Sequence, residues 1–227
     1  MVALLPTSVT NMERFLARCH RRRYSAKSNI IYMGDKSESL YFLVSGSMSV
    51  LIEGEDGKEM IIAYLNQGEF FGEMGLFGEE ESRRSAWVRA KSTCEVAEIS
   101  YTKFHEISAE HPEIVFAIEQ QMARRLRAIT RKAMDLAFLD VTGRIAHMLL
   151  EFARQSGANI HPEGMQINVS RQEIAMSVGC SREMVTRVLK VMEERGIVSI
   201  TGRSILIRNA RSTRNQSTAE SQLADYL

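Results

Sequence analysis

The sequence predicts an α+β fold made of an N-terminal antiparallel β-roll (jelly roll) barrel, a long helix and a C-terminal winged helix-turn-helix. Three observations predict it. Short apolar segments separated by glycine turns fill residues 24–100, a heptad-like apolar pattern runs through 110–138, and two short helical patterns joined by a glycine turn lie within 170–195. We expect the parts of the chain to be 1–109, 110–139, 140–208 and 209–227.

Composition sets the broad class of the protein. The chain has 227 residues, of which 44% are hydrophobic and 25% are charged, as in an ordinary soluble protein with room for two cores. It has no run of about 18 apolar residues and no signal peptide, so we expect a cytoplasmic protein that does not enter a membrane. Cys19, Cys94 and Cys180 are far apart and form no CxxC pair, so we expect neither a disulfide nor a bound metal.

The first part is predicted to be a short helix followed by a barrel. The helix covers Asn11–Arg23 and ends in the cluster His20-Arg21-Arg22-Arg23. Glycine-containing turns then separate segments rich in Ile, Val, Leu, Tyr and Phe. These segments are Asn29–Tyr32, Ser39–Val44, Met48–Glu53, Glu59–Leu65 and Val96–Ile99. Their length and spacing favour a compact antiparallel barrel or jelly roll, which can enclose one small ligand.

The long helix follows His111-Pro112, since proline is tolerated in a first turn. Its apolar residues recur at spacings of 4, 3, 4 and 3, at Met122, Leu126, Ile129, Ala133 and Leu136. This is the seam of a helix that pairs with another helix, so we predict a homodimer. The alternative is an amphipathic core helix within one domain.

The remaining chain begins with connecting segments. We expect a hinge at Leu139–Thr142, a helix over Gly143–Arg154, a surface loop over Ser156–Gly164 and a short strand over Met165–Val169. The tail from Asn209 to Leu227 is rich in Ser, Thr, Asn and Gln, and this composition predicts mobility.

Two short helices joined by a tight turn then predict a helix-turn-helix. Ser170-Arg171-Gln172-Glu173 is a capping box that begins a helix over Gln172–Val178. Gly179-Cys180-Ser181 forms the turn, and the second helix covers Arg182–Arg195. A hairpin over 197–207 forms the wing.

One glycine-rich stretch has the chemistry of a phosphate and ribose cradle. Gly72-Glu73-Met74-Gly75-Leu76-Phe77 is followed, after an acidic loop, by Arg84-Ser85-Ala86-Trp87. Glycines let backbone N–H groups approach an anion, and an arginine closes the cage. An ionised Glu73 can accept a hydrogen bond from a sugar hydroxyl. The alternative is a plain turn followed by a strand.

The second helix of the helix-turn-helix has the chemistry of a DNA reader. Residues 182–214 contain eight Lys and Arg against three acidic residues, which favours a polyanion partner. Arg182, Glu183 and Arg187 project on roughly one face, where Arg can bond guanine and Glu can accept from cytosine. The alternative is a solvated helix face with a Glu183–Arg187 salt bridge.

This order of parts resembles the cyclic AMP receptor protein (catabolite activator protein) family, which includes the virulence factor regulators. The resemblance covers about residues 11–208. It is carried by Phe138-Leu139-Asp140-Val141-Thr142-Gly143-Arg144-Ile145, by Val178-Gly179-Cys180-Ser181-Arg182-Glu183, and by Ala86-Trp87-Val88-Arg89-Ala90-Lys91. It implies a dimeric transcription regulator that responds to cyclic AMP.

The resemblance also assigns roles in the ligand site. It implies that Gly72, Glu73, Arg84 and Ser85 hold the ribose and cyclic phosphate of cyclic AMP. It implies that two helix positions lie beside the adenine, Ile129 from the same subunit and Thr130 from the partner. The family usually has a hydroxyl at the first of these positions, and Ile129 lacks it. This departure leaves open a relative that responds to another nucleotide such as cyclic di-GMP, or one active without a ligand.

In the second half the resemblance implies contacts with double-stranded DNA. Arg182, Glu183 and Arg187 would contact base edges in a palindrome with TGTGA-type half-sites, and phosphates would lie near Ser170, Gln172, Ser181 and Lys190. RNA polymerase would contact the loop Ser156–Gly164 and the residues His20, Arg22 and Lys103. Two other classes are disfavoured. An enzyme lacks a metal-ligand cluster, and a sensor acting only on a protein partner has no use for the helix-turn-helix.

Overall fold

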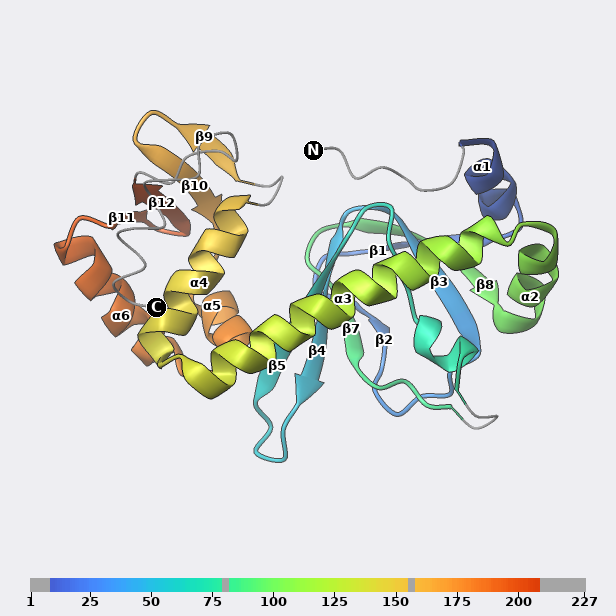
Figure 1. Cartoon of the computed structure of the whole chain (residues 1–227), viewed down its shortest axis with the longest axis horizontal. Helices are drawn as coiled ribbons and strands as arrows, with labels where there is room; N and C mark the ends of the chain where they lie inside the picture. The colour runs from blue at the N-terminus through green and yellow to red at the C-terminus, as the bar shows by residue number, and fades with distance from the viewer. Residues whose placement is uncertain (1–8, 79–81, 155–157, 209–227) are drawn as a thin grey trace. The chain divides into compact units, whose positions relative to one another are not determined.

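The computed structural model describes residues 9–78, 82–154 and 158–208 (Figure 1). The predicted tail 209–227 therefore lies outside the described residues. The chain divides between Thr130 and Arg131 into two compact units, and each unit is described by itself.

The first unit contains two four-stranded antiparallel sheets. Their strand orders are β1-β8-β3-β6 and β2-β7-β4-β5. The strands are β1 (His20–Tyr24), β2 (Asn29–Ile31), β3 (Ser39–Ser45), β4 (Ser47–Glu53), β5 (Glu59–Asn66), β6 (Phe70–Phe71), β7 (Trp87–Ala90) and β8 (Cys94–Ser100). Leu43, Met48 and Val88 pack in a core that joins both sheets. The predicted β-roll is confirmed, although the sequence had not shown β6 or β7 as strands.

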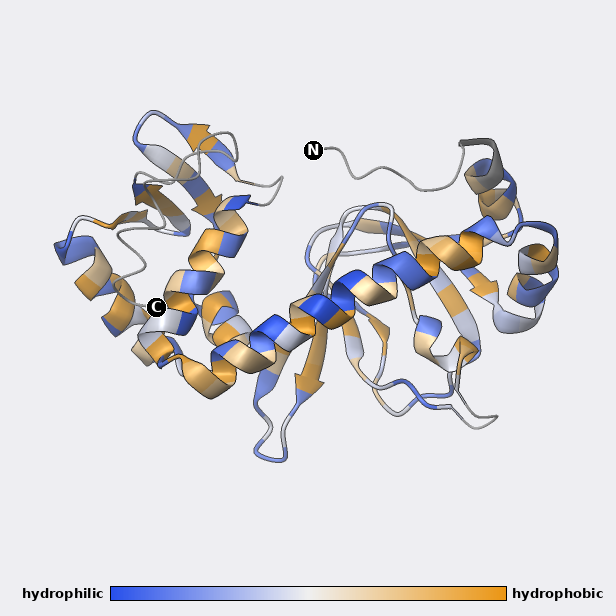
Figure 2. Cartoon of the chain, in the orientation of Figure 1, coloured by the Kyte–Doolittle hydropathy of each residue, from blue (hydrophilic) through white to orange (hydrophobic). Residues whose placement is uncertain are grey.

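Helices cover the other face of the first of these sheets. They are α1 (Val9–Ala17), α2 (Tyr101–Glu110) and the first half of α3 (Glu113–Phe138). Phe15, Phe42, Phe104 and Ile118 pack together in this second core. The residues His111 and Pro112 are not helical and separate α2 from α3. The predicted long helix is confirmed as α3, which begins at Glu113. Figure 2 shows hydrophobic and hydrophilic residues interspersed along α3.

The helix expected over Asn11–Arg23 is wrong at its C-terminal end. The helix α1 ends at Ala17, and the basic cluster forms β1, which pairs with β8 from His20↔Glu98 to Tyr24↔Cys94. The ion pairs from Arg21 and Arg23 to Glu95 measure 3.3 and 3.7 Å. Backbone pairing with a strand more than 70 residues away outweighs local helix preference here.

The second unit is a helical core with a four-stranded sheet. The elements are α4 (Val141–Arg154), β9 (Asn159–His161), β10 (Gly164–Asn168), α5 (Arg171–Val178), α6 (Arg182–Glu194), β11 (Val198–Thr201) and β12 (Ser204–Arg208). The strands are ordered β11-β12-β10-β9, and the β11–β12 hairpin is the predicted wing. Ile145, Leu149, Ile174, Val185 and Met192 are among the residues that form the core.

Two expected connections are shorter than predicted. The helix α4 begins at Val141, and Asp140 Oδ1 accepts a hydrogen bond from the Gly143 backbone N–H at 2.7 Å, so only Leu139 and Asp140 separate it from α3. Part of the expected loop Ser156–Gly164 is strand β9, because its backbone pairs with β10. Residues 155–157 lie outside the described chain.

Candidate functional site

The glycine-rich stretch forms a tight corner after β6. Gly72 has a φ of 76°, a left-handed conformation that favours glycine, and the 3-10 helix η1 (Glu73–Leu76) follows it. A Cβ at Gly72 would lie 2.7 Å from Arg84 Nη1, and one at Gly75 would lie 2.6 Å from the Tyr101 hydroxyl. Both glycines therefore make room for polar side chains of the protein itself, a role that the sequence did not suggest.

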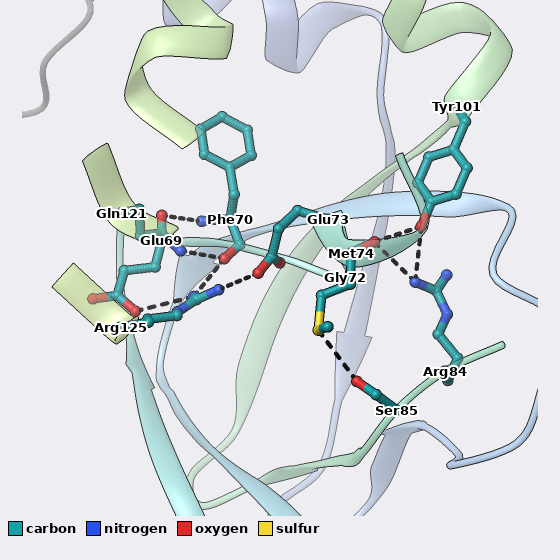
Figure 3. Close-up of polar contacts among 10 residues, drawn as sticks. All are labelled: Glu69, Phe70, Gly72, Glu73, Met74, Arg84, Ser85, Tyr101, Gln121 and Arg125. Carbon is teal, nitrogen blue, oxygen red and sulfur yellow. Dashed lines mark hydrogen bonds and ion pairs between the residues drawn. The ribbon is translucent and has the colours of Figure 1, made fainter. Parts of the chain in front are cut away.

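Arg84 is a buried cation in this corner. Only 8% of the surface of Arg84 is exposed. Nη1 donates to the carbonyl of Gly72 at 3.0 Å and to the Tyr101 hydroxyl at 3.2 Å (Figure 3). Nη2 donates to the carbonyl of Ser39 at 2.8 Å. In the described part of the chain no carboxylate lies within 4.0 Å of it. A buried charge of this kind is stabilised by an anion.

Glu73 is the second buried charge, and it is paired. It is 7% exposed and accepts from Arg125 Nη1 at 3.0 Å. Arg125 Nη2 also donates to the carbonyl of Phe70 at 2.6 Å, and the buried Gln121 amide accepts from the Phe70 N–H at 2.9 Å (Figure 3). Gln121 and Arg125 thus join α3 to the strand before the cradle. Sequence reasoning missed both residues, although their spacing of four places them on one helix face.

One cavity of about 280 Å³ in the first unit is lined by Glu73, Arg84 and Arg125, among other residues. It brings together five predicted residues, Gly72, Glu73, Arg84, Ser85 and Ile129. The exposed Ser85 hydroxyl lies 3.3 Å from Met74 Sδ (Figure 3). Thr130 does not line the cavity; it is exposed, and its hydroxyl donates to the carbonyl of Leu126 at 2.9 Å. Thr130 is therefore the one predicted ligand residue that this chain does not bring to the cavity.

The cavity has both polar and apolar lining residues. The polar ones are Ser37, Glu73, Arg83, Arg84, Ser85 and Arg125. The walls from the strands β4 and β5 are apolar, with Val50, Ile62, Ala63 and Leu65. The helix α3 adds Met122, Leu126 and Ile129, and its one charged lining residue, Arg125, is bound to Glu73. The arrangement fits an anion attached to a flat apolar group.

The helix-turn-helix has the predicted geometry. Ser170 Oγ accepts from the Glu173 N–H at 3.1 Å, and Ser181 Oγ accepts from the Met184 N–H at 3.2 Å, so a serine caps each helix. Gly179 ends α5 in the left-handed region with a φ of 74°, and the tight turn follows.

The face of α6 that points to solvent is charged. Arg182, Glu183, Arg187 and Lys190 are exposed, whereas Val185, Val188 and Leu189 are buried. Lys190 pairs with Glu194 at 3.8 Å. Among the described residues no carboxylate lies within 4.0 Å of the Arg182 or Arg187 side chain, so the alternative Glu183–Arg187 salt bridge is not formed. Gln172 on α5 is exposed as well.

Glu183 is held in its ionised form. Its own backbone N–H and the Ser181 hydroxyl keep the pKa of the Glu183 carboxyl below its usual range. An ionised carboxylate is an acceptor only, which is the form that can take a hydrogen bond from an amino group of a base.

The described residues contain neither a metal-ligating cluster nor a membrane-spanning helix. No group of three or more His, Cys, Asp and Glu side chains is arranged to hold a metal ion within residues 9–78, 82–154 and 158–208. Over the same residues, no helix is both long enough and apolar enough to span a bilayer.

Comparison with known proteins matches both units. Residues 21–111 match the cyclic nucleotide-binding domain, and residues 143–212 match the Crp-like helix-turn-helix domain. The chain is 56% identical to the cAMP-activated global transcriptional regulator Vfr of Pseudomonas aeruginosa, over 93% of this chain and 100% of the relative. It is 52% identical to the regulator CRP of Salmonella typhimurium, with the same coverage. The chain belongs to the CRP family of transcription regulators.

A solved structure of the CRP family supports the fold as well. The regulator CLP of Xanthomonas campestris, described as c-di-GMP responsive, is 42% identical, with a TM-score of 0.84 over 89% of this chain and 100% of that one. Family membership confirms the resemblance drawn from the sequence motifs. The cavity beside α3 lies within the residues that match the cyclic nucleotide-binding domain or close to them, and α6 lies within the Crp-like helix-turn-helix match.

Proposed function

We propose that this CRP-family chain is a homodimeric transcription regulator that binds palindromic promoter DNA in response to cyclic AMP. The observation that carries the proposal is Arg84, a buried cation with no carboxylate within 4.0 Å among the described residues, in a cavity whose walls from β4 and β5 are apolar. Cyclic AMP supplies one phosphate charge and one flat base. The relatives Vfr and CRP, which are 56% and 52% identical to this chain, are named as cAMP-activated.

The cavity residues have distinct roles in this proposal. Arg84 and Ser85 bind the cyclic phosphate, and the Gly72 corner allows close approach. Glu73 accepts a hydrogen bond from the ribose hydroxyl, and Arg125 holds that carboxylate in place. The base lies among apolar residues that include Ile129, and Thr130 reaches it from the partner.

The seam of α3 is the proposed dimer interface. Leu126 is 67% exposed and Leu136 is 44% exposed, although both are apolar. A second copy of α3 would cover them in the arrangement of a coiled coil. Residues 110–139 then form the dimerisation helix between a nucleotide-binding part, 1–109, and a DNA-binding part, 140–208.

DNA would be read by α6 of each subunit. Arg182, Glu183 and Arg187 contact base edges, and phosphates lie near Ser170, Gln172, Ser181 and Lys190. Two such helices must lie about 34 Å apart to enter successive major grooves. Ligand shifts this arrangement only to the extent that it binds it better than the alternatives.

RNA polymerase is the proposed further partner. The proposed location of the protein is the cytoplasm. His20 and Arg22 are exposed and lie on one face of β1, since strand residues two apart share a face. Their neighbours Arg21 and Arg23 are the ones paired with Glu95. Lys103 on α2 is also exposed. The loop 156–164 is described only from residue 158.

Calorimetric titration with cyclic AMP, followed by DNA-binding anisotropy, tests the proposal. We expect saturable binding that tightens association with a TGTGA-type palindrome and not with random DNA. Arg84→Gln should abolish the response and leave the fold intact. Chromatography of the ligand after incubation should show no turnover. Binding of cyclic di-GMP and not cyclic AMP would show that the ligand is a different nucleotide. DNA binding that no ligand changes would show a regulator that is active without a ligand.

A further inference from the structure

The Tyr101 hydroxyl is a polar junction inside the cradle. It donates to the carbonyl of Gly72 at 2.5 Å, and it accepts from Arg84 Nη1 at 3.2 Å (Figure 3). The Ser37 hydroxyl lies 2.8 Å away. A phenol has one hydrogen and two lone pairs. Because that hydrogen is given to Gly72, Ser37 must be a donor here, and the Tyr101 hydroxyl is fully used.

These contacts restrict how Arg84 can face a ligand. A guanidinium donates through Nη1, Nη2 and Nε, and the first two atoms are directed to Gly72, Tyr101 and Ser39. Among the described residues Nε of Arg84 has no hydrogen-bond partner, so this donor is left for a phosphate oxygen. The rings of Tyr41 and Tyr101 lie 5.4 and 6.0 Å from Arg84 Cζ, so the guanidinium plane is confined as well.

The surrounding fold is shaped to hold Tyr101 in this position. Its backbone N–H donates to the carbonyl of Glu38 at 3.0 Å, at the point where α2 begins. A Cβ at Gly75 would lie 2.6 Å from the Tyr101 hydroxyl oxygen. Ser37 Oγ would lie closer still, so the second glycine of the cradle leaves room for the hydrogen-bonded hydroxyls of Ser37 and Tyr101.

We propose that Tyr101 is a positioning residue that aims Arg84 at one of the two exocyclic oxygens of a cyclic phosphate. Tyr101 acts through Arg84 and the Gly72 carbonyl and does not itself contact the ligand. This inference rests on the proposed binding of cyclic AMP.

The test compares Tyr101→Phe, which removes only the hydroxyl, with the wild-type dimer. Each is titrated by calorimetry with cyclic AMP and with its two phosphorothioate diastereomers, in which sulfur replaces either the axial or the equatorial exocyclic oxygen. We expect about a 3- to 10-fold loss of cyclic AMP affinity, the size of one hydrogen bond. We also expect the affinity ratio of the two diastereomers to move toward one, because Arg84 is no longer aimed.

Two further variants make the result specific. Ser37→Ala leaves the tyrosine in place and should change the ratio in the same direction by a smaller factor. Tyr64→Phe removes a hydroxyl from a residue outside the cavity lining. Lys91 Nζ lies 4.3 Å from the centroid of the Tyr64 ring, which this variant keeps. It should leave both quantities unchanged. Thermal unfolding without ligand checks that each variant is folded.

The outcomes separate this inference from the proposed function. An equal loss for cyclic AMP and both diastereomers, with an unchanged ratio, would show a merely structural tyrosine and overturn the inference. Unchanged affinities in Tyr101→Phe would also overturn it. If the wild-type protein binds none of the three compounds, the proposed function fails first, and the inference fails with it.

Discussion

Ile129 belongs to both the cavity and the seam. It lines the cavity, and 44% of its surface is exposed on the face of α3 that would meet a partner. Ile129→Thr restores a hydroxyl beside the base, so we expect about a 2- to 10-fold gain in cyclic AMP affinity. The same change weakens an apolar seam, so DNA binding without ligand should decrease. Calorimetry and anisotropy measure the two effects.

Ile129→Val is the matched control, because it keeps the residue apolar and β-branched. It should leave the ligand dependence of DNA binding close to that of the wild type. We infer that the apolar Ile129 favours the DNA-binding arrangement of the dimer before ligand binds. The same strict requirement for ligand in Ile129→Thr and in the wild type would contradict this.

Single residues also show how far the sequence could predict the site. The glycines and Arg84-Ser85 were found because a phosphate cradle needs those residue types close together in sequence. Tyr101 and Arg125 were not, because they approach Gly72 and Glu73 from 29 and 52 residues away. Polar residues on an amphipathic helix have the same pattern whether they face solvent or a buried carboxylate.

Among the elements, α6 gives the sharpest prediction. Arg182→Ala or Arg187→Ala should weaken binding to the specific palindrome by about 1–3 kcal/mol and relax selectivity at one base pair. Each arginine is exposed, and no carboxylate of the described residues lies within 4.0 Å of its side chain. Its guanidinium is therefore available to a base edge. Anisotropy with single-base variants of the site measures the change.

Lys190→Ala is the contrasting variant on the same helix. A phosphate contact carries no sequence information, so its loss should weaken specific and random DNA alike and reduce the salt dependence. Equal losses on specific and random DNA for Arg182→Ala would contradict direct base reading by that arginine.

The elements that were predicted well have their determinants nearby in sequence. Ser170 and Ser181 cap α5 and α6, and Gly179 forms the turn between them. The strand β1 was missed because its basic residues give no alternating pattern, and its ion pairs are with β8. The two-residue strand β6 is too short to have a pattern of its own, and it is held by Gln121 from α3.

At the scale of the whole molecule, the proposed function places ligand recognition and dimer assembly on one helix. The helix α3 brings Gln121 and Arg125 to the cradle, and Leu126 and Ile129 form part of the cavity wall while being exposed on the seam. A ligand in the cavity and a partner helix therefore share the same side chains. The heptad-like spacing predicted the seam, but no spacing could show that its first half is also a cavity wall.

The seam can be tested without disturbing the cavity, because Leu136 lies on it and outside the cavity lining. Leu136→Glu places a charge in the proposed interface, so sedimentation should show a monomer. Affinity for the palindrome should then fall by a factor on the order of 100 or more, toward that of a half-site, because two linked contacts become one. Met134→Glu adds the same charge to an exposed position of α3 off the seam. It should stay dimeric, and a dimeric Leu136→Glu variant would contradict pairing through this seam.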